Sequence, residues 1–201
     1  ALQERGWNCL YLSNHDQPRQ VSRFGDDGRY WHESATMLAT LLHTLRGTPF
    51  VMQGEETGMT NVAFASVEDY DDVECRNYYA EALSGGEDPD VALKRIHRAS
   101  RDNARTPMQW NAKKNAGFTT GAPWIGVNPN YVRVNVDAQR ADHQSVLAYY
   151  RRLIELRRSH PVIVYGSFRE VETDVPSVFS YQRKLGDTRV LVVLNLADEH
   201  T

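Results

Sequence analysis

Six consecutive residues, Asn14-His15-Asp16-Gln17-Pro18-Arg19, place an imidazole, a carboxylate and a guanidinium directly after the apolar run Leu10-Tyr11-Leu12. These groups could bind a polar substrate and stabilise charge in a transition state. Ionisable side chains at the carboxyl end of a strand are where α/β barrels and open α/β sheets place their chemistry. Asn, Asp and Pro are equally typical of a tight turn. The motif alone therefore leaves a catalytic cluster and an ordinary turn both open.

The segments around this motif predict a parallel strand, helix, strand unit. Residues 7–12 and 48–53 are expected to be buried strands, and residues 33–46 have apolar side chains at helical spacing. Gly47 is expected to end the helix in the left-handed conformation. Gly54-Glu55-Glu56 follows the second strand. Parallel strands joined by a crossover helix point the same way, so both polar clusters should fall at one sheet edge, which favours the catalytic interpretation.

The composition restricts the class of partner. The 201 residues are 41% hydrophobic and 24% charged, as in a globular protein that buries a core. A net charge of -3 gives no long-range attraction for nucleic acid or anionic lipid, so we expect a small-molecule substrate and neither a nucleic acid nor a membrane partner. The first residue is Ala1 and no signal-peptide core follows it, so we expect a truncated beginning.

No cofactor or metal is expected. Cys9 and Cys75 belong to no metal-ligand motif, and they are too few for a disulfide framework. The Cys9 thiol is expected to be buried and inert, and the chain to be cytoplasmic, where thiols stay reduced. The acidic run over residues 68–74 lacks the alternating ligands and central glycine of an EF-hand, which argues against calcium.

Residues 59–140 are predicted to form a long, mostly irregular insertion, the kind of segment that often serves as a lid or binding region. Two helices are expected within it, at residues 73–83 and 90–99. Asp88 and Pro89 should provide the N-cap and first-turn residue of the second helix. The insertion's tryptophans are expected to pack it together rather than to bind a ligand; they are Trp110 and Trp124.

The carboxyl-terminal part changes from helix to strand. Residues 144–158 predict an amphipathic helix whose late arginines should complement the helix dipole and face solvent rather than bind phosphate. Strands are expected from residue 162 onward. A hairpin with a Gly186-Asp187 turn lies among them, which indicates the start of a separate β unit.

Four motifs, in this order, resemble the carboxyl-terminal half of oligo-1,6-glucosidases and related α-glucosidases of the α-amylase superfamily: Asn14 to Arg19, Gln53 to Met59, Arg101 to Trp110 and Val127 to Tyr131. The resemblance implies an α/β fold. Residues 1–160 would be the last strands and helices of a (β/α)8 TIM barrel, including the insertion at about 59–140. Residues 161–201 would begin an antiparallel β-sandwich domain.

The same resemblance implies a chemistry. The family hydrolyses α-glucosidic bonds with retention, using a nucleophilic carboxylate, a carboxylic acid and a third carboxylate. By motif, Asp16 is the third carboxylate, which stabilises the transition state. His15 and Arg101 would bind the same glucose, and Glu74 would contact the leaving-group sugar. Glu74 could also be part of a solvated helix start.

The remaining carboxylates of the implied mechanism, and two glutamates of this chain, are also assigned by the resemblance. The resemblance places the nucleophile and the acid before residue 1, so the chain by itself is expected to be inactive. Glu55 and Glu56 are then expected to be structural hydrogen-bonding groups. Asn111 stands where the family often has aspartate, away from the implied site.

The implied activity of the full-length enzyme is release of terminal α-1,6-linked glucose from isomalto-oligosaccharides, so the expected partner is a small oligosaccharide. Trehalose-6-phosphate hydrolysis and α-1,4-glucosidase activity stay open as alternatives. A non-catalytic, amylase-like accessory subunit is the alternative from a different class. The joint presence of His15, Asp16 and Arg101 argues against that subunit. The oligomeric state is left open.

Overall fold

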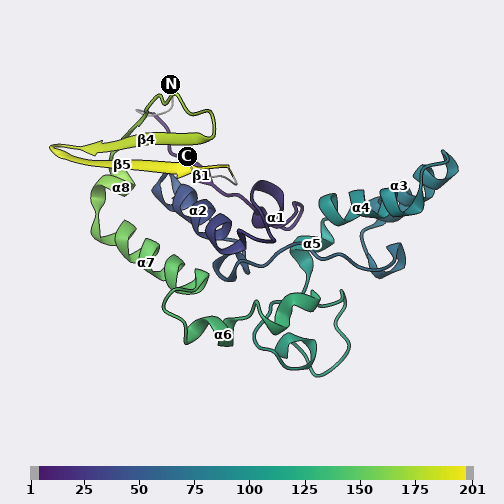
Figure 1. Ribbon diagram of the computed structural model, residues 1–201. Coiled ribbons are helices and arrows are strands. Elements are labelled where there is room, and N and C mark those ends of the chain that lie inside the picture. The colour runs from purple at the N-terminus through teal and green to yellow at the C-terminus, as the bar shows by residue number, and fades with distance from the viewer. Residues whose placement is uncertain (1–4, 198–201) are drawn as a thin grey trace.

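The strand, helix, strand unit is present in the computed structural model, which describes residues 5–197 (Figure 1). β1 (Cys9–Leu10) and β2 (Thr48–Pro49) pair in parallel, and α1 (Gln20–Phe24) and α2 (Trp31–Thr44) connect them. Both strands are shorter than expected, because the hydrogen-bonded length of a strand depends on its neighbours. Within the described residues, β1 and β2 pair only with each other.

The faces of these two strands are also less covered than expected. Cys9 is exposed rather than buried. Tyr11 and Phe50, next to the strand ends, are 57% and 54% exposed. The prediction that both faces of these strands are buried is therefore wrong for the structure of residues 5–197, where these side chains stay largely exposed.

Gly47 serves a purpose other than the expected helix stop. α2 already ends at Thr44, and its C-cap Leu45 is extended. Gly47 has a φ of +149°, and a Cβ placed there would lie 2.6 Å from the Asn8 carbonyl oxygen. The glycine therefore allows the chain entering β2 to approach β1 closely.

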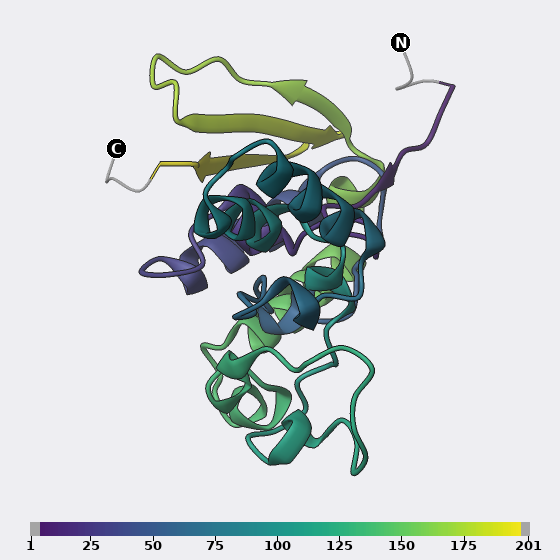
Figure 2. The ribbon, with the colours of Figure 1, turned by 90° about the vertical axis from the view of Figure 1, so that its right-hand side faces the viewer.

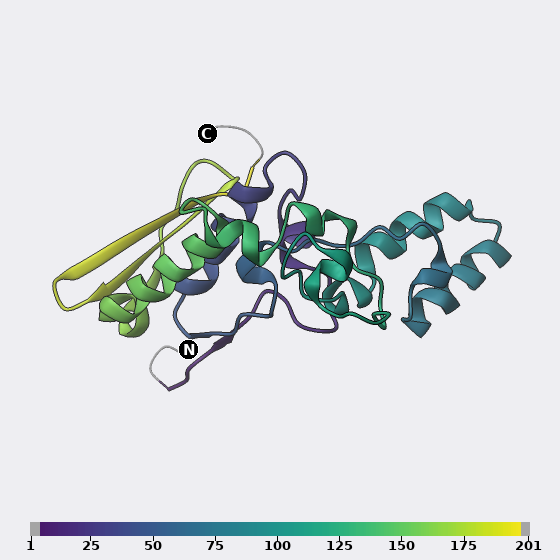
Figure 3. The same ribbon diagram turned by 90° about the horizontal axis from the view of Figure 1, so that it is seen from below.

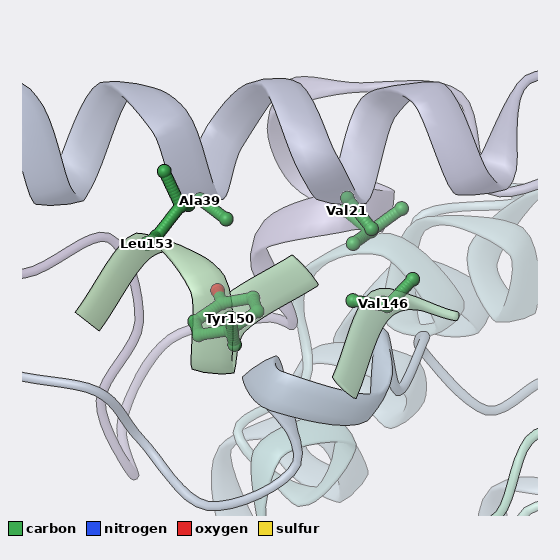
Figure 4. Packing of buried hydrophobic residues seen from close by; sticks show 6 residues of the cluster. Val21, Ala39, Val146, Tyr150 and Leu153 are labelled. Atoms are coloured by element: carbon green, nitrogen blue, oxygen red, sulfur yellow. The ribbon is translucent and has the colours of Figure 1, made fainter. Parts of the chain in front are cut away.

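The main core lies between α1, α2 and α7 (Val146–Ser159). Ser145 caps α7 by accepting a hydrogen bond from the Ala148 amide. Figure 4 shows Val21, Ala39, Val146, Tyr150 and Leu153 packed together, and Ala35 completes this buried cluster. The helical periodicity seen in the sequence is thus the periodicity of this interface.

One of the late α7 arginines does not face solvent as expected. Arg157 donates hydrogen bonds to the carbonyl oxygens of His43, at 2.7 Å, and Gly47. These carbonyls lie at and beyond the end of α2, where the helix itself provides no donors. Arg151, Arg152 and Arg158 are exposed, as expected.

The carboxyl-terminal strands form an antiparallel sheet in the order β3 (Ser167–Glu170), β4 (Val178–Leu185) and β5 (Thr188–Asn195). Strand structure begins later than expected, because α8 (Pro161–Tyr165) continues as a short helix with proline in its first turn. Gly186 turns the predicted hairpin with a φ of +57°. Figure 2 shows this sheet lying over one side of the helices.

The sheet packs on a second face of α2. Its inward side chains are Tyr181, Val192 and Leu194, and they meet Met37 and Leu41 from the helix and Leu45 from its C-cap. α2 is therefore covered on one side by α7 and on another by the sheet, and it joins the two hydrophobic clusters.

The insertion contains the expected helical hairpin. α3 (Val73–Ser84) and α4 (Pro89–Ala99) are capped by Asp72 and Asp88, whose carboxylates accept backbone amides of the first turn. The hairpin has a small core of its own, with Tyr70, Cys75 and Ile96 buried. It projects from the body at the end opposite the sheet (Figures 1 and 3).

A short helix, η1 (Glu55–Thr57), precedes the insertion. The remainder of the insertion is short helices and loops: η2 (Val67–Asp69), α5 (Asp102–Arg105), η3 (Lys114–Gly117), η4 (Pro129–Val132) and α6 (Val136–Arg140). The expectation that the tryptophans pack this region is wrong, because Trp124 is 76% exposed and Trp110 is 46% exposed. The buried cluster of Met59, Met108 and Val136 packs it instead. None of the helices within residues 5–197 is both long and apolar enough to cross a bilayer.

Candidate active site

The polar clusters after β1 and β2 lie together, joined by a buried arginine. Arg19 is 1% exposed. Its guanidinium donates to the carbonyl oxygen of Gln53 at 2.6 Å and to that of Asn103 at 3.1 Å. Burial lowers the pKa of the Arg19 guanidinium to about 10, and the negative charges of Glu55 and Glu56 oppose that shift. Arg19 therefore stays charged at neutral pH and ties both strand ends to α5.

Asp16 lies at the tip of the loop after β1. The Asn14 carboxamide oxygen accepts the Asp16 amide at 2.8 Å, which makes the turn that the sequence indicated. This turn leaves the side chains of His15 and Asp16 73% and 50% exposed, with His15 Nε2 3.1 Å from Asp16 Oδ2. The motif can therefore be both a tight turn and a candidate catalytic cluster, because the turn leaves the side chains of His15 and Asp16 open to solvent.

Arg101 is held by a carboxylate that the sequence analysis did not single out. Its Nε donates to Oδ2 of Asp72 at 3.0 Å, and its Nη2 donates to Oδ1. The Asp72 side chain is only 2% exposed. The Arg101 hydrogen bond holds the pKa of the Asp72 carboxyl at about 2, against the opposing effect of burial. The only sequence signal for Asp72 was its position as an acidic N-cap immediately before α3.

Glu74 lies on the open side of the same arginine. Its Oε1 is 3.4 Å from Arg101 Nη2, and its side chain is 74% exposed. Arg101 therefore has one carboxylate fixed beneath it and a second one facing solvent.

Three of the four expected site residues line one cavity of about 410 Å³, into which a sugar-sized ligand could enter. They are Asp16, Glu74 and Arg101, and His15 lies beside the cavity through its contact with Asp16. The other lining residues are Asp72, Cys75, Tyr78, Arg95, Ile96 and Ala99. The loop after β1, the α3–α4 hairpin and the residue preceding α5 thus meet around a cavity that has charged side chains on its wall.

The two glutamates after β2 differ from each other. Glu56 accepts the Gly54 amide at 2.8 Å, as expected for a structural group. Glu55 is 2% exposed, and neither of its carboxylate oxygens has a hydrogen-bond partner among the described residues. Burial raises the Glu55 pKa to about 7; the nearby Ser13 hydroxyl partly opposes the shift without reaching hydrogen-bond geometry. The expectation of a hydrogen-bonding role is therefore wrong for Glu55.

α5 connects the parts of the site. The Asp102 carboxylate accepts the amides of Asp71 and Asp72 at 2.6 and 2.9 Å, which fixes the start of α3. At its other end, Arg105 reaches back to Asp16, with 2.7 Å between Nη2 and Oδ1. Arg105 lies in the motif from Arg101 to Trp110, but nothing local to that motif indicates a partner far away in the chain.

Comparison with known proteins assigns the chain to a family. Residues 1–166 match the family described as alpha amylase, catalytic domain. The oligo-1,6-glucosidase of Parageobacillus thermoglucosidasius is 54% identical over 199 residues, which are 98% of this chain and 35% of that protein. The trehalose-6-phosphate hydrolase of Escherichia coli (strain K12) is 47% identical over 96% of this chain and 35% of its own length. The chain thus spans about a third of these relatives.

Solved structures agree with this assignment. A trehalose-6-phosphate hydrolase from Bacillus licheniformis superposes with a TM-score of 0.93 at 44% identity, over 95% of this chain and 34% of that one. The isomaltulose synthase of Erwinia rhapontici gives a TM-score of 0.89 at 46% identity, over 96% of this chain and 35% of that one. The chain therefore belongs to the alpha-amylase family, and its helices and parallel strand pair are part of that family's TIM-barrel catalytic domain.

Proposed function

We propose that the intact enzyme, meaning this segment within a complete catalytic domain, is a retaining glycoside hydrolase that releases terminal α-1,6-linked glucose from isomalto-oligosaccharides. The observation that carries the proposal is the convergence of the charged side chains of Asp16, Glu74 and Arg101 on one cavity. The match to oligo-1,6-glucosidases supports the choice of linkage.

Each side chain has a role that follows from its surroundings. Asp16 would bind hydroxyls of the reacting glucose and stabilise it as the ring becomes an oxocarbenium ion. His15, next to Asp16, would bind the same sugar. Arg101, held rigid by the buried Asp72, would orient sugar hydroxyls through its planar guanidinium. The exposed Glu74 would contact the leaving-group sugar.

The nucleophile and the proton donor are proposed to come from the part of the catalytic domain outside these residues. A retaining mechanism needs them about 5 Å apart across the sugar. No metal or cofactor takes part in the proposed reaction, and the proposed partner is the oligosaccharide substrate alone.

We further propose that residues 1–160 are the carboxyl-terminal part of the barrel and that residues 161–201 begin a β-sandwich domain. The antiparallel order of β3, β4 and β5 after α8 supports this division. A cytoplasmic location is also proposed, and the free thiols of Cys9 and Cys75 are consistent with a reducing compartment.

Trehalose-6-phosphate hydrolysis is the second candidate function. It is favoured by the 47% identity to the Escherichia coli enzyme and by the superposition on the Bacillus licheniformis structure. An α-1,4-glucosidase is the remaining enzymatic candidate.

A substrate panel with the intact enzyme separates these candidates. Initial rates on isomaltose, isomaltotriose, maltose and trehalose 6-phosphate should give the highest kcat/KM for the two α-1,6-linked substrates. The released glucose, followed by NMR, should appear first as the α anomer. A preference for trehalose 6-phosphate or maltose would replace the proposed substrate, and hydrolysis of none of them would favour the accessory-subunit alternative.

A further inference from the structure

Arg105 links α5 to the loop that carries Asp16. Its Nη2 donates to Asp16 Oδ1 at 2.7 Å, and its Nε donates to the carbonyl oxygen of His15 at 2.9 Å. One planar guanidinium therefore holds both the backbone and the side chain of the loop. The contact joins residues 89 positions apart in the sequence.

The base from which Arg105 projects is rigid. Ala104 and Thr106, on either side of Arg105, are buried, and so is Asn103. The Asn103 side chain accepts the Val62 amide at 3.0 Å and donates to the His97 carbonyl oxygen at 3.0 Å. The Arg105 guanidinium therefore extends from a fixed backbone and contacts the Asp16 carboxylate on an exposed turn.

Asp16 needs such a partner because its own environment constrains it weakly. Its side chain is 50% exposed, and rotation of a carboxylate about its last side-chain bond is intrinsically broad. With Oδ1 on Arg105 and Oδ2 facing His15, the carboxylate plane is defined on the wall of the 410 Å³ cavity. A group that stabilises a transition state is effective only when its orientation is set before the reaction.

We propose that Arg105 is a positioning residue for the reaction: it holds the Asp16 carboxylate in the orientation that meets the hydroxyls of the reacting glucose. This inference rests on the proposed function. The inference gives different roles to Arg101 and Arg105, which lie four residues apart at the start and the end of the α5 segment. Arg101 is paired with a buried carboxylate and faces the ligand itself, whereas Arg105 acts through Asp16.

A purely structural role makes a different prediction. A partly exposed ion pair contributes little to folding, so a structural Arg105 would change stability slightly and kcat hardly at all. A positioning Arg105 would change kcat much more than KM, because a misplaced group weakens transition-state stabilisation more than ground-state binding.

The test uses the intact enzyme and p-nitrophenyl α-glucoside. Arg105→Ala should lower kcat about 100-fold with KM within about threefold. Arg105→Lys keeps the charge but cannot make both hydrogen bonds, so its kcat should be intermediate. Added guanidinium ion should raise the rate of Arg105→Ala and leave Arg105→Lys unchanged. The matched control is Arg98→Ala, an exposed arginine of α4, which should match the parent.

A double-mutant cycle tests the route through Asp16. If Arg105 acts by holding that carboxylate, Arg105→Ala should lower the residual kcat of Asp16→Asn by less than about threefold. If the two substitutions lower kcat by independent factors that multiply in the double variant, the inference is overturned. It is also overturned if Arg105→Lys has the parental kcat and guanidinium does not rescue Arg105→Ala. A parent without glucosidase activity would refute the proposed function itself. A parental rate in Arg105→Ala would refute only the positioning role.

Discussion

Asp16 and Asp72 both face an arginine, and burial makes the two pairs different. The Asp72 side chain is 2% exposed and takes both hydrogen bonds of Arg101 in a fixed geometry. The Asp16 side chain is 50% exposed and uses one oxygen on Arg105. A buried pair of this kind holds structure in place, whereas a half-exposed carboxylate keeps lone pairs for a ligand. The proposed roles of these residues follow that division.

Replacing Asp16 tests its proposed role in the transition state. Asp16→Asn in the intact enzyme should lower kcat on isomaltose by about 100-fold or more, because the amide lacks the charge that stabilises an oxocarbenium ion. KM should change by only about threefold, since an amide still bonds sugar hydroxyls. Steady-state kinetics measure both constants, with Asp137→Asn, an exposed aspartate of α6, as the control. A near-parental kcat in Asp16→Asn would remove Asp16 from the mechanism.

The Asp72 carboxylate should make stability depend on acid pH. Its pKa in the folded state is about 2, below the ordinary value of 3.8, so its contribution is present above about pH 4 and disappears as the pH falls toward 2. Loss of the ionised group should cost about 2 kcal/mol in the free energy of unfolding at pH 6. Asp72→Asn should therefore be less stable than the parent at pH 6, and the difference should shrink toward pH 2.

Urea unfolding between pH 2 and 7 measures this difference. The control is Asp71→Asn, because Asp71 is 43% exposed and its contact with Arg76 is long, at 3.6 Å. A stability difference between Asp72→Asn and the parent that did not vary with pH would contradict the linkage between Asp72 ionisation and folding.

At the scale of elements, α5 is a short segment with a large organising effect. It has four residues, too few to be stable as an isolated helix. Buried contacts to the loops after β1 and β2 and to the start of α3 hold it in place. Arg101, just before α5, lines the cavity, and Arg105, its last residue, contacts Asp16 on the cavity wall. The geometry of the site therefore depends on tertiary contacts of α5 rather than on its helix propensity.

Removing the anchor of α5 should affect stability and activity together. Asn103→Ala leaves the buried Val62 amide without its partner and removes one of the two side-chain donors to the His97 carbonyl oxygen, the other being Asn61, which should destabilise the protein by about 1 to 3 kcal/mol. kcat should fall as well, because Arg101 and Arg105 both move with α5. Thermal unfolding and initial rates provide the two measurements, with the exposed Asn77→Ala on α3 as control. Full activity in Asn103→Ala would show that α5 does not position the site.

At the scale of the whole molecule, the chain has two ends with different structures. The β3–β5 sheet packs on α2 at one end, and the α3–α4 hairpin projects at the other (Figure 3). The cavity lined by Asp16, Glu74 and Arg101 lies where the hairpin meets the loop after β1. Apolar side chains such as Tyr11 and Phe50 are uncovered, in keeping with a chain that matches about 35% of the length of its relatives.

The proposed division of roles predicts the behaviour of the 201-residue chain alone. It should release no glucose from isomaltose or p-nitrophenyl α-glucoside, because the proposed nucleophile and proton donor are not among its residues. A coupled glucose assay on purified chain is the measurement, with the intact enzyme as positive control. Measurable turnover that copurifies with the chain would show that the assignment of roles is wrong.

The sequence by itself determined the elements whose signals are local. The Asp88-Pro89 cap, the Gly186-Asp187 turn and the helical period of residues 144–158 all indicated structures that are present, with ends displaced by a few residues. Strand order also placed the polar clusters after β1 and β2 at one edge. Caps, turns and periodicity act within a few residues, which is why one sequence reveals them.

Only the tertiary structure decided which side chains meet. Arg105 and Asp16 are 89 residues apart, Arg101 and Asp72 are 29 apart, and Arg157 reaches carbonyls more than 100 residues away. No local pattern encodes those partners, because each depends on how separate segments pack. The same reason explains the exposed Cys9 and the unpartnered Glu55 carboxylate. Whether a side chain is covered or hydrogen-bonded is a property of its neighbours in space, and the sequence around it indicates only what such neighbours would have to be.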